Sequence, residues 1–209
     1  MTGSREKILS DIRNSILKRQ ATEKIPLDLD GDIYPHLNCS LEEKFCDELV
    51  KVNGSCFFCN DHKELNDKLK ELITERKWDI VYCIDQQLRT LLTDIDDLFC
   101  HDNDKFRQTE AAVTTCEFLI ARTGSVMVSS ALSSGRRFNV FPPVHIIVAY
   151  SSQLVYDLSD AYNNMRQKYP GALPSMISVI TGPSRTADIE KTLILGAHGP
   201  KEFIVFVVK

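Results

Sequence analysis

The chain has 209 residues, of which 43% are hydrophobic, and this is enough to bury one good-sized core with a small appendage. Its formal net charge is -4 and its pI is near 5.8. No stripe of Lys and Arg dominates, so the charge pattern gives no support for nucleic-acid binding. The longest apolar runs have the length of strands and are too short to span a bilayer. The first twenty residues contain no continuous apolar segment of the kind found in secretory signals, so we expect a cytoplasmic protein without a membrane span.

The chain begins with an amphipathic helical pattern. Ile8, Ile12 and Ile16 recur at helical spacing between Ser4 and about Arg19. The following stretch contains two prolines, a glycine and several aspartates without a sustained period, which predicts an extended connector. We therefore expect residues 1–40 to form an N-terminal helical arm with its connector, and residues 41–209 to form the main domain. An exposed amphipathic arm favours association into a homodimer or a larger complex.

Helical and strand-like patterns alternate beyond the arm. Ser40 and Glu43 have the spacing of a capping box, which predicts a helix that ends at Asn53-Gly54. Strands are predicted at "SCFFC", "DIVYCI", "SVMVSSA", "VHIIVAY", "SMISVIT" and "EFIVFVV". Helices are predicted at "DHKELNDKLKELITERK", "DQQLRTLLTDI", "DLSDAYNNMRQKY" and "TADIEKTLILG". This alternation is typical of βαβ units, so the predicted fold class is α/β, with a largely parallel sheet flanked by helices.

Seven cysteines are present, an odd number, and several lie inside apolar runs. Without an export signal, we expect reduced and mostly buried thiols. Cys56 and Cys59 have C-x-x-C spacing, but no second pair stands at zinc spacing and no iron–sulfur run is present, so we expect no metal and no cofactor in this chain. The alternative is a thiol-redox protein that uses this pair, which requires an accessible cysteine of lowered pKa.

The stretch Thr181–Glu190 is a candidate anion site. In open α/β sheets, ligands bind beyond the carboxyl ends of the strands. This stretch follows a predicted strand, turns at Gly182-Pro183 and is expected to start a helix, whose free N–H groups favour phosphate or carboxylate. Acids at Asp188 and Glu190 also stabilise a helix start without a ligand, so a structural corner is the alternative. The predicted ligand-binding residues here are Gly182, Ser184, Arg185 and Thr186.

The turn Thr123–Ser125 is a second candidate, because its small residues let the backbone approach a ligand closely. Gly124 and Ser125 are the predicted ligand-binding residues of this turn. Glu117 lies upstream on a predicted helix and is a candidate acid or base, with an exposed, solvated carboxylate as the alternative.

His198 lies among glycines in a connecting loop without an obvious packing role, and it is the second candidate for proton transfer. For His145, at the start of a strand, we favour a structural role. Arg137 either binds an anion or solvates its loop. We predict that the loops Thr123–Ser125, Thr181–Thr186 and His198–Gly199 gather at one rim of a single sheet.

Three of these stretches carry a family resemblance. "ARTGSVMVSS", "RRFNVFPPVHIIV" and "ITGPSRTADIEKTLILGAHGPKEFIVFVV" resemble the LUD-domain family of lactate-utilisation (LutC/YkgG-like) proteins, most specifically over the last third of the chain. The resemblance implies a fold of the NagB/RpiA/CoA-transferase type. It also implies association with an iron–sulfur-dependent system that oxidises L-lactate to pyruvate, with the clusters in partner subunits. Arg122 stands where relatives commonly have an acid, which reverses the local charge.

Two functional hypotheses follow. The first is an accessory or regulatory subunit of a lactate-oxidising iron–sulfur complex, with a pocket for a small carboxylate or phosphate. The second is a stand-alone enzyme of the isomerase or transferase type that acts on a phosphorylated or CoA-linked small metabolite. In the second, Arg137, Ser125, Ser184 and Arg185 hold the anion, and Glu117 or His198 moves the proton.

Overall fold

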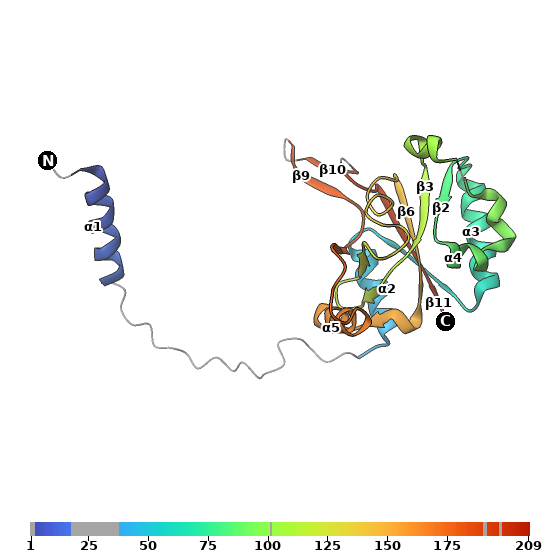
Figure 1. Cartoon of the computed structure of the whole chain (residues 1–209), viewed down its shortest axis with the longest axis horizontal. Helices are drawn as coiled ribbons and strands as arrows, with labels where there is room; N and C mark the ends of the chain where they lie inside the picture. The colour runs from blue at the N-terminus through green and yellow to red at the C-terminus, as the bar shows by residue number, and fades with distance from the viewer. Residues whose placement is uncertain (1–2, 18–37, 101, 190–191, 197) are drawn as a thin grey trace. The chain divides into compact units, whose positions relative to one another are not determined.

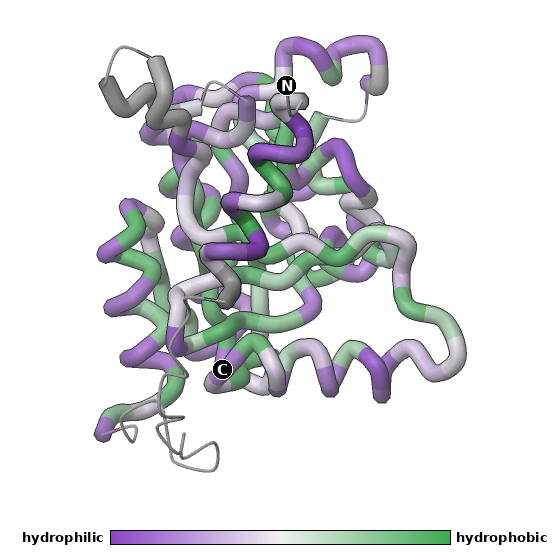
Figure 2. The backbone as a smooth tube through the Cα atoms, turned by 90° about the vertical axis from the view of Figure 1, so that its left-hand side faces the viewer, coloured by the Kyte–Doolittle hydropathy of each residue, from purple (hydrophilic) through white to green (hydrophobic). Residues whose placement is uncertain are grey.

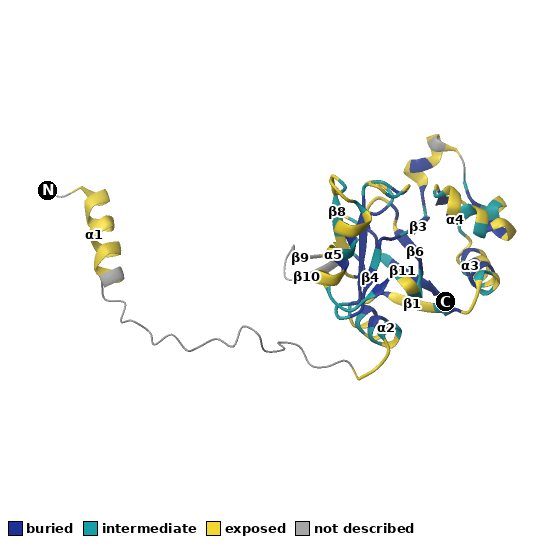
Figure 3. Ribbon diagram, turned by 60° about the horizontal axis from the view of Figure 1, so that its bottom comes forward, coloured by how far each residue is buried: buried dark blue, intermediate teal, exposed yellow. Residues whose placement is uncertain are grey.

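The structure, a computed structural model, describes residues 3–17, 38–100, 102–189, 192–196 and 198–209. The chain divides into two units, Met1–Asn38 and Cys39–Lys209. The first contains helix α1 (Ser4–Leu17), on which Ile8, Leu9 and Ile12 are exposed (Figure 3). The predicted N-terminal helix is therefore present. The predicted connector falls largely on residues 18–37, outside the described ranges.

The second unit is built on a five-stranded, all-parallel sheet, which confirms the predicted α/β class (Figure 1). The strand order is β1-β11-β6-β3-β2. Its central strands are buried on both faces, so each is a continuous apolar run instead of an alternating one. The bounds are β1 (Ser55–Cys59), β2 (Val81–Cys83), β3 (Ala111–Thr115), β6 (Val144–Tyr150) and β11 (Glu202–Val208).

A second, smaller sheet packs behind the parallel one. Its strand order is β7-β4-β5-β8, and it is antiparallel except between β4 and β7. The predicted strands "SVMVSSA" and "SMISVIT" are confirmed as strands, but they belong to this sheet. The bounds are β4 (Phe118–Ile120), β5 (Ser125–Ser129), β7 (Leu154–Val155) and β8 (Ile177–Ile180).

Helices cover both outer surfaces of these sheets. In Figure 1, α3 (His62–Arg76) and α4 (Gln86–Leu91) lie on one side of the parallel sheet, whereas α2 (Leu41–Lys51) and α5 (Leu158–Lys168) lie on the other. One core cluster joins α3 and α4 to the parallel sheet, and a second joins α2, the parallel sheet and the second sheet. A third joins α5 to the outer face of the second sheet. Figure 2 shows this pattern as hydrophobic strands inside and helices of alternating hydropathy outside.

Local sequence signals start the helices. The Ser40 hydroxyl accepts from the Glu43 N–H, and the Glu43 carboxylate accepts from the Ser40 N–H, so the predicted capping box is formed. Asp61 caps α3 by accepting from the Glu64 N–H. At α5, Asp157 accepts from first-turn N–H groups and Asp160 accepts from the Asp157 N–H, which is a second capping box. Short 3-10 helices η1 (Thr93–Leu98), η2 (Asn103–Gln108) and η3 (Ser151–Gln153) complete the connections.

The predicted helix at "TADIEKTLILG" is wrong. This stretch forms two antiparallel strands, β9 (Arg185–Ile189) and β10 (Thr192–Leu195), which pair with each other and form a separate two-stranded sheet. No helix N-terminus therefore follows Gly182-Pro183, and the helix-dipole argument for anion binding at this point fails. Glu190 lies outside the described residues.

The cysteines also differ from the prediction. Cys46 of α2 and Cys56 of β1 form a disulfide, so these two are not the reduced thiols that we expected. Cys59 is a free, buried thiol, as are Cys83 and Cys116. Because β1 is extended, Cys56 and Cys59 point to opposite faces of the sheet, Cys56 toward the second sheet and Cys59 toward α3.

Candidate functional site

The candidate site lies at the carboxyl edge of the parallel sheet, between β2 and β3. The chain leaves β2 toward the face covered by α3 and α4, but it leaves β3 toward the opposite face to enter β4. Two neighbouring strands whose connections leave on opposite faces form a crevice at their carboxyl ends, which is the general ligand position in open parallel sheets.

A pocket of about 550 Å³ lies at this crevice. Thr115 is the last residue of β3 and Cys116 follows it, whereas Asp85 lies two residues after the end of β2. Asp85 caps α4 through its first carboxylate oxygen, and its second accepts from the Thr115 hydroxyl at 3.3 Å. The other lining residues are Gln86, Gln87, Leu88, Leu91, Ala131, Leu132, Ser133, Val148, Tyr150, Gln153 and Lys168.

Glu117 lies behind this pocket as a buried carboxylate, with 1% of its surface exposed. Its Oε2 accepts from Lys168 Nζ at 2.7 Å, and its Oε1 accepts from the Ser129 hydroxyl at 2.5 Å and from the Tyr169 hydroxyl at 2.9 Å. Three donors therefore compensate the loss of water around this charge, as a buried carboxylate requires.

The backbone of this region is also fixed. The Gln153 amide donates to the carbonyls of Cys116 and Glu117, at 2.6 and 3.2 Å, and its Oε1 accepts from the Tyr150 N–H. The carboxyl ends of β3 and β6 are thus joined at the pocket wall.

Lys168 connects Glu117 to the pocket. Its side chain is about half exposed, and it both lines the pocket and pairs with the buried carboxylate. Partial burial alone lowers the pKa of Lys168, but the hydrogen bond and charge of Glu117 outweigh it, so the pKa lies above its ordinary 10.5. Burial and the hydrogen bond to Glu117 likewise raise the pKa of Tyr169. The ammonium therefore stays charged at neutral pH and presents a cation to the cavity.

The structure corrects the prediction for Glu117. This residue is on no helix, because it stands between β3 and β4 where the chain passes from one sheet to the other. Neither is it the exposed, solvated carboxylate of our alternative. The stretch Phe118–Ile120, predicted as helical, is a strand.

The sequence model of the LUD domain matches residues 42–208. This chain belongs to the LUD domain family. The predicted resemblance is therefore confirmed, and the match covers the whole second unit except its first and last few residues.

Curated proteins with related sequences match about half of the chain. Lactate utilization protein C of Bacillus subtilis is 35% identical over 98 residues, which are 46% of this chain and 41% of that protein. Lactate utilization protein C of Shouchella clausii is 35% identical over 100 residues, 47% of this chain and 44% of that protein. An uncharacterized protein of Neisseria meningitidis serogroup B is 32% identical over 103 residues, 49% of this chain and 44% of that protein. The LUD domain chain thus matches less than half the length of these curated relatives.

One solved structure supports the fold. The crystal structure of a DUF162 family protein from Deinococcus radiodurans superposes with a TM-score of 0.61 at 16% sequence identity. The superposition covers 84% of this chain and all of the other. At this identity, the likeness concerns the fold of the LUD domain alone.

The three predicted loops lie close together near the amino edge of the parallel sheet, but they do not belong to a single sheet as we predicted. Thr123–Ser125 and Thr181 border β5 and β8 of the second sheet, whereas His198–Gly199 precede β11 of the parallel sheet. The Ser125 hydroxyl is 2.8 Å from that of Thr181. The Ser184 N–H donates to the Pro200 carbonyl at 2.8 Å, directly before β11. We applied the rule for carboxyl ends to Thr181–Glu190. This stretch does follow a strand, β8, but β8 belongs to the second sheet and is antiparallel to its neighbour, so the rule for parallel sheets does not apply there. The carboxyl-edge pocket of the parallel sheet lies elsewhere.

Several predicted ligand residues of this cluster pack against the end of α2. A Cβ on Gly124 would lie 2.2 Å from the Leu49 backbone nitrogen, and one on Gly182 would lie 2.4 Å from the Val52 carbonyl oxygen. The Arg185 guanidinium donates to that same carbonyl. Close packing therefore accounts for these three residues, and their role in ligand binding stays a prediction.

The remaining predicted residues lie nearby. Thr186 lies in β9, where its backbone pairs with Ile194 of β10. Arg137 and His198 line a separate cavity at the amino edge. Arg122 pairs with Asp157 at the start of α5, with 2.9 Å between Nε and Oδ2.

The cysteine pair does not have the properties of a redox site. Cys56 is bonded to Cys46, and burial raises the pKa of Cys59, the opposite of an activated thiol. Among the described residues, no group of three or more His, Cys, Asp and Glu is placed to hold a metal ion. Within the described ranges, no helix is both long enough and apolar enough to cross a membrane.

Sequence reasoning missed Asp85, Thr115, Gln153 and Lys168, which with Glu117 build the site. A signal was present for two of them. Asp85 directly follows the apolar run "DIVYCI", and Thr115 ends an apolar run before Glu117, so both were readable as strand ends. Lys168 had no such signal, because the ion pair to Glu117 joins residues 51 positions apart.

Proposed function

We propose that this LUD domain is an accessory or regulatory subunit of a cytoplasmic, iron–sulfur-dependent system that oxidises L-lactate, and that it holds a small carboxylate in the carboxyl-edge pocket. Two of the relatives reported above carry the name lactate utilization protein C, which supports the pathway. In this proposal the iron–sulfur clusters belong to partner subunits. This chain contributes ligand binding.

The Lys168 ammonium in the wall of the pocket is the main support for carboxylate binding. L-Lactate and pyruvate are small monocarboxylates, and a charged hydrogen bond from an ammonium is a strong fixed contact for such a group. The Thr115 and Ser133 side chains line the same pocket and supply hydroxyl groups for the hydroxyl or keto oxygen next to the carboxylate. The buried Glu117 holds Lys168 in place, so the cation is oriented before the ligand arrives.

The pathway is tested in the native cells. We expect the tagged chain to co-purify with a protein that contains iron and acid-labile sulfide, and deletion of its gene to abolish growth on L-lactate. Complementation with the double variant Glu117→Gln, Lys168→Met should fail, whereas Arg166→Met, on the same helix and outside the carboxyl-edge pocket, should restore growth. The double variant is used because it removes the cation without leaving an unpaired buried carboxylate. A deletion strain that oxidises L-lactate at the parental rate contradicts the proposal.

The second candidate function is an isolated enzyme that acts on a phosphorylated or CoA-linked metabolite. The buried carboxylate of Glu117, paired with a lysine at the wall of a pocket, favours it, because such pairs are common in acid–base sites. Turnover of sugar phosphates or acyl-CoA thioesters by the purified chain, abolished by Glu117→Gln, would support this candidate. The accessory-subunit proposal predicts no turnover by the isolated chain.

A further inference from the structure

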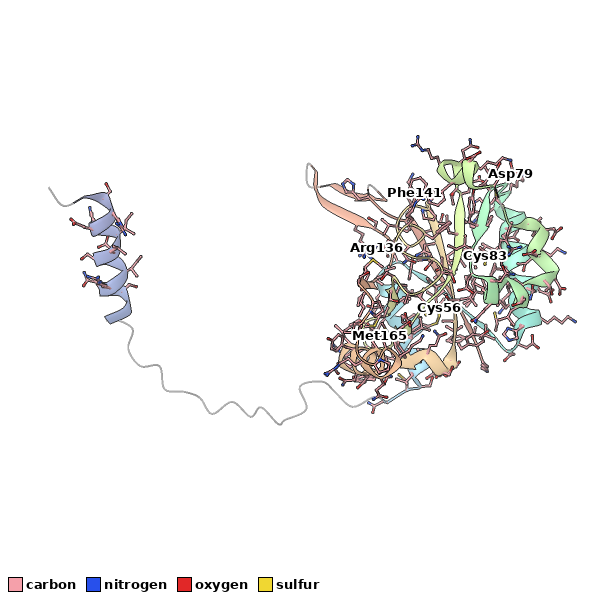
Figure 4. The ribbon with its side chains drawn as sticks, viewed as in Figure 1. Cys56, Asp79, Cys83, Arg136, Phe141 and Met165 are labelled. Carbon is pink, nitrogen blue, oxygen red and sulfur yellow. A yellow bond between two sulfur atoms is a disulfide. The ribbon has the colours of Figure 1, made fainter. Side chains whose placement is uncertain are left out.

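A second cavity lies at the amino edge of the parallel sheet. Its volume is about 470 Å³, within the range of small-molecule sites. Pro143 directly precedes β6 and Lys201 directly precedes β11, whereas the carboxyl-edge pocket contains Tyr150 at the far end of β6. Pro143 and Tyr150, at the two ends of the seven-residue strand β6, are separated by about 23 Å, at 3.3 Å per residue. Figure 4 shows Phe141, of the amino-edge cavity, at the end of this unit opposite to Met165 of α5.

One wall of this amino-edge cavity is aromatic. Phe106 and Phe141 are stacked with their ring centroids 4.5 Å apart and their planes 25° apart. Phe106 is buried, whereas Phe141 keeps 48% of its surface exposed, and the neighbouring Val140 keeps 52%. The cavity therefore presents a flat apolar surface to solvent.

Positively charged side chains line the same cavity. The Arg137 guanidinium lies 4.2 Å from the centroid of the Phe106 ring, and Lys201 and His198 also line the cavity. Among the described residues, no acidic side chain lines this cavity and no carboxylate forms an ion pair with Arg137 or Lys201. In a chain with a formal charge of -4, this is a local concentration of positive charge beside an aromatic surface.

Backbone contacts fix the wall opposite to the aromatic rings. Gly196 has a φ of +74°, and a Cβ there would lie 2.1 Å from Cγ of Lys201, so only glycine lets the lysine stem cross at this point. The Gly196 N–H donates to the Ser184 carbonyl at 2.9 Å, and the Ser184 N–H donates to Pro200. Ser184, a predicted ligand residue, thus holds the loop that carries His198 and Lys201.

We propose that the amino-edge cavity binds a small ligand that combines a flat aromatic ring with a negatively charged group. The ring lies against Phe141, and the anion lies between Arg137 and Lys201. The aromatic ring of the ligand gains stacking on Phe141, and its anionic group gains charged hydrogen bonds from the two cations. These two contributions to the binding free energy are separate, so we expect the ligand to contain both a ring and an anionic group. This site goes beyond the proposed function, because a small aliphatic carboxylate has no ring to place on Phe141.

The test is calorimetric titration of the full chain with four probes: benzoate, acetate, adenosine 5'-monophosphate and inorganic phosphate. We expect benzoate or the nucleotide to bind, at least tenfold more tightly than the probe with the same anion and no ring. Which of the two binds decides whether the charged group is a carboxylate or a phosphate. Binding by neither aromatic probe, or equal binding of probes with and without a ring, overturns the proposal.

Substitutions of residues that line the amino-edge cavity test whether the probes bind there. Arg137→Met and Phe141→Ala change exposed side chains and should each weaken binding about tenfold, the usual scale for one charged or aromatic contact. The matched control is Arg136→Met, since Arg136 is exposed, donates to Ser175 and is outside the lining. If Arg137→Met does not fold, Lys201→Met tests the same cation pair. Equal losses in Arg136→Met and Arg137→Met contradict this location.

Discussion

At the scale of single residues, Gly124 is the clearest constraint on the fold. It combines a φ of +59° with a backbone approach that leaves no room for a Cβ beside Leu49. We predict that Gly124→Ala destabilises the domain by about 3 kcal/mol or more, because left-handed strain and a clash with backbone add together. Urea unfolding followed by circular dichroism measures this.

Gly135 is the matched control for that substitution. Its φ is +55°, yet a Cβ there would meet nothing within 4 Å. Gly135→Ala should therefore show the conformational strain alone, about 1–2 kcal/mol. Equal losses of stability in the two variants would show that the contact with α2 is unimportant.

His145 is a second residue with a specific prediction. It is completely buried, its Nε2 lies 2.8 Å from the Thr114 hydroxyl, its ring packs on Phe203, and burial lowers its pKa to about 3. The folded chain keeps the imidazole neutral, whereas the unfolded chain protonates it near pH 6.5. The free energy of unfolding therefore holds above pH 6.5 and falls as the pH drops toward 3, by about 2 kcal/mol at pH 5 from this residue.

Urea unfolding between pH 5 and pH 7 checks this dependence. His145→Gln should remove most of the slope, whatever its effect on stability at pH 7. The exposed His198→Gln is the control and should keep the wild-type slope. A slope that survives in His145→Gln assigns the pH dependence to other groups.

At the scale of elements, the Cys46–Cys56 disulfide joins α2 to β1 across a separation of 10 residues. A closed loop of this size stabilises a domain by about 3 kcal/mol through the entropy of the unfolded chain. We predict that a reductant lowers the free energy of unfolding by about this amount, and that it has no effect on the double variant Cys46→Ser, Cys56→Ser. Thiol titration of the denatured, unreduced chain should count the five free cysteines, and a count of seven contradicts the bond.

Elements with strong local signals were predictable from the sequence. The Ser40–Glu43 capping box located α2, the helical patterns located α3 and α5, and the continuous apolar runs located β1, β6 and β11. The local sequence specifies such elements, because the cap residues and the apolar period of the buried face both lie within the element or directly beside it.

The elements that we predicted wrongly depend on pairing with other strands, which the local sequence pattern does not reveal. The stretch "TADIEKTLIL" has the charges of a helix start, but each half pairs with the other as a β-ribbon. The stretch from Phe118 to Ile120 is only three residues long, too short for a period to separate helix from strand, and its strand character comes from β5 and β7. Misassignment of this strand also concealed Glu117 as a buried carboxylate.

At the scale of the whole molecule, the main domain should not need the N-terminal segment. Residues 42–208 match the LUD domain, and residues 39–209 contain all the described core clusters. We predict that a chain of residues 39–209 unfolds with the same midpoint and the same denaturant dependence as the full chain. A loss of more than about 1 kcal/mol would mean that residues 1–38 pack on the domain.

The placement of the two cavities was beyond the sequence, since both are assembled from residues far apart in the chain. Glu117 and Lys168 form an ion pair across 51 positions at the carboxyl edge, and Phe106 and Lys201 line the same cavity at the amino edge. In the enzyme hypothesis from the sequence, Glu117, Arg137 and His198 serve one pocket. The structure separates Glu117 from the other two.

The central claim is that the carboxyl-edge pocket binds a small carboxylate through Lys168. Calorimetric titration of the purified full chain with L-lactate and pyruvate tests it most directly. We predict that at least one of them binds the wild type, that Glu117→Gln with Lys168→Met weakens this binding tenfold or more, and that Arg166→Met leaves it unchanged. No binding by the wild type, or binding that the double variant retains, would contradict the account.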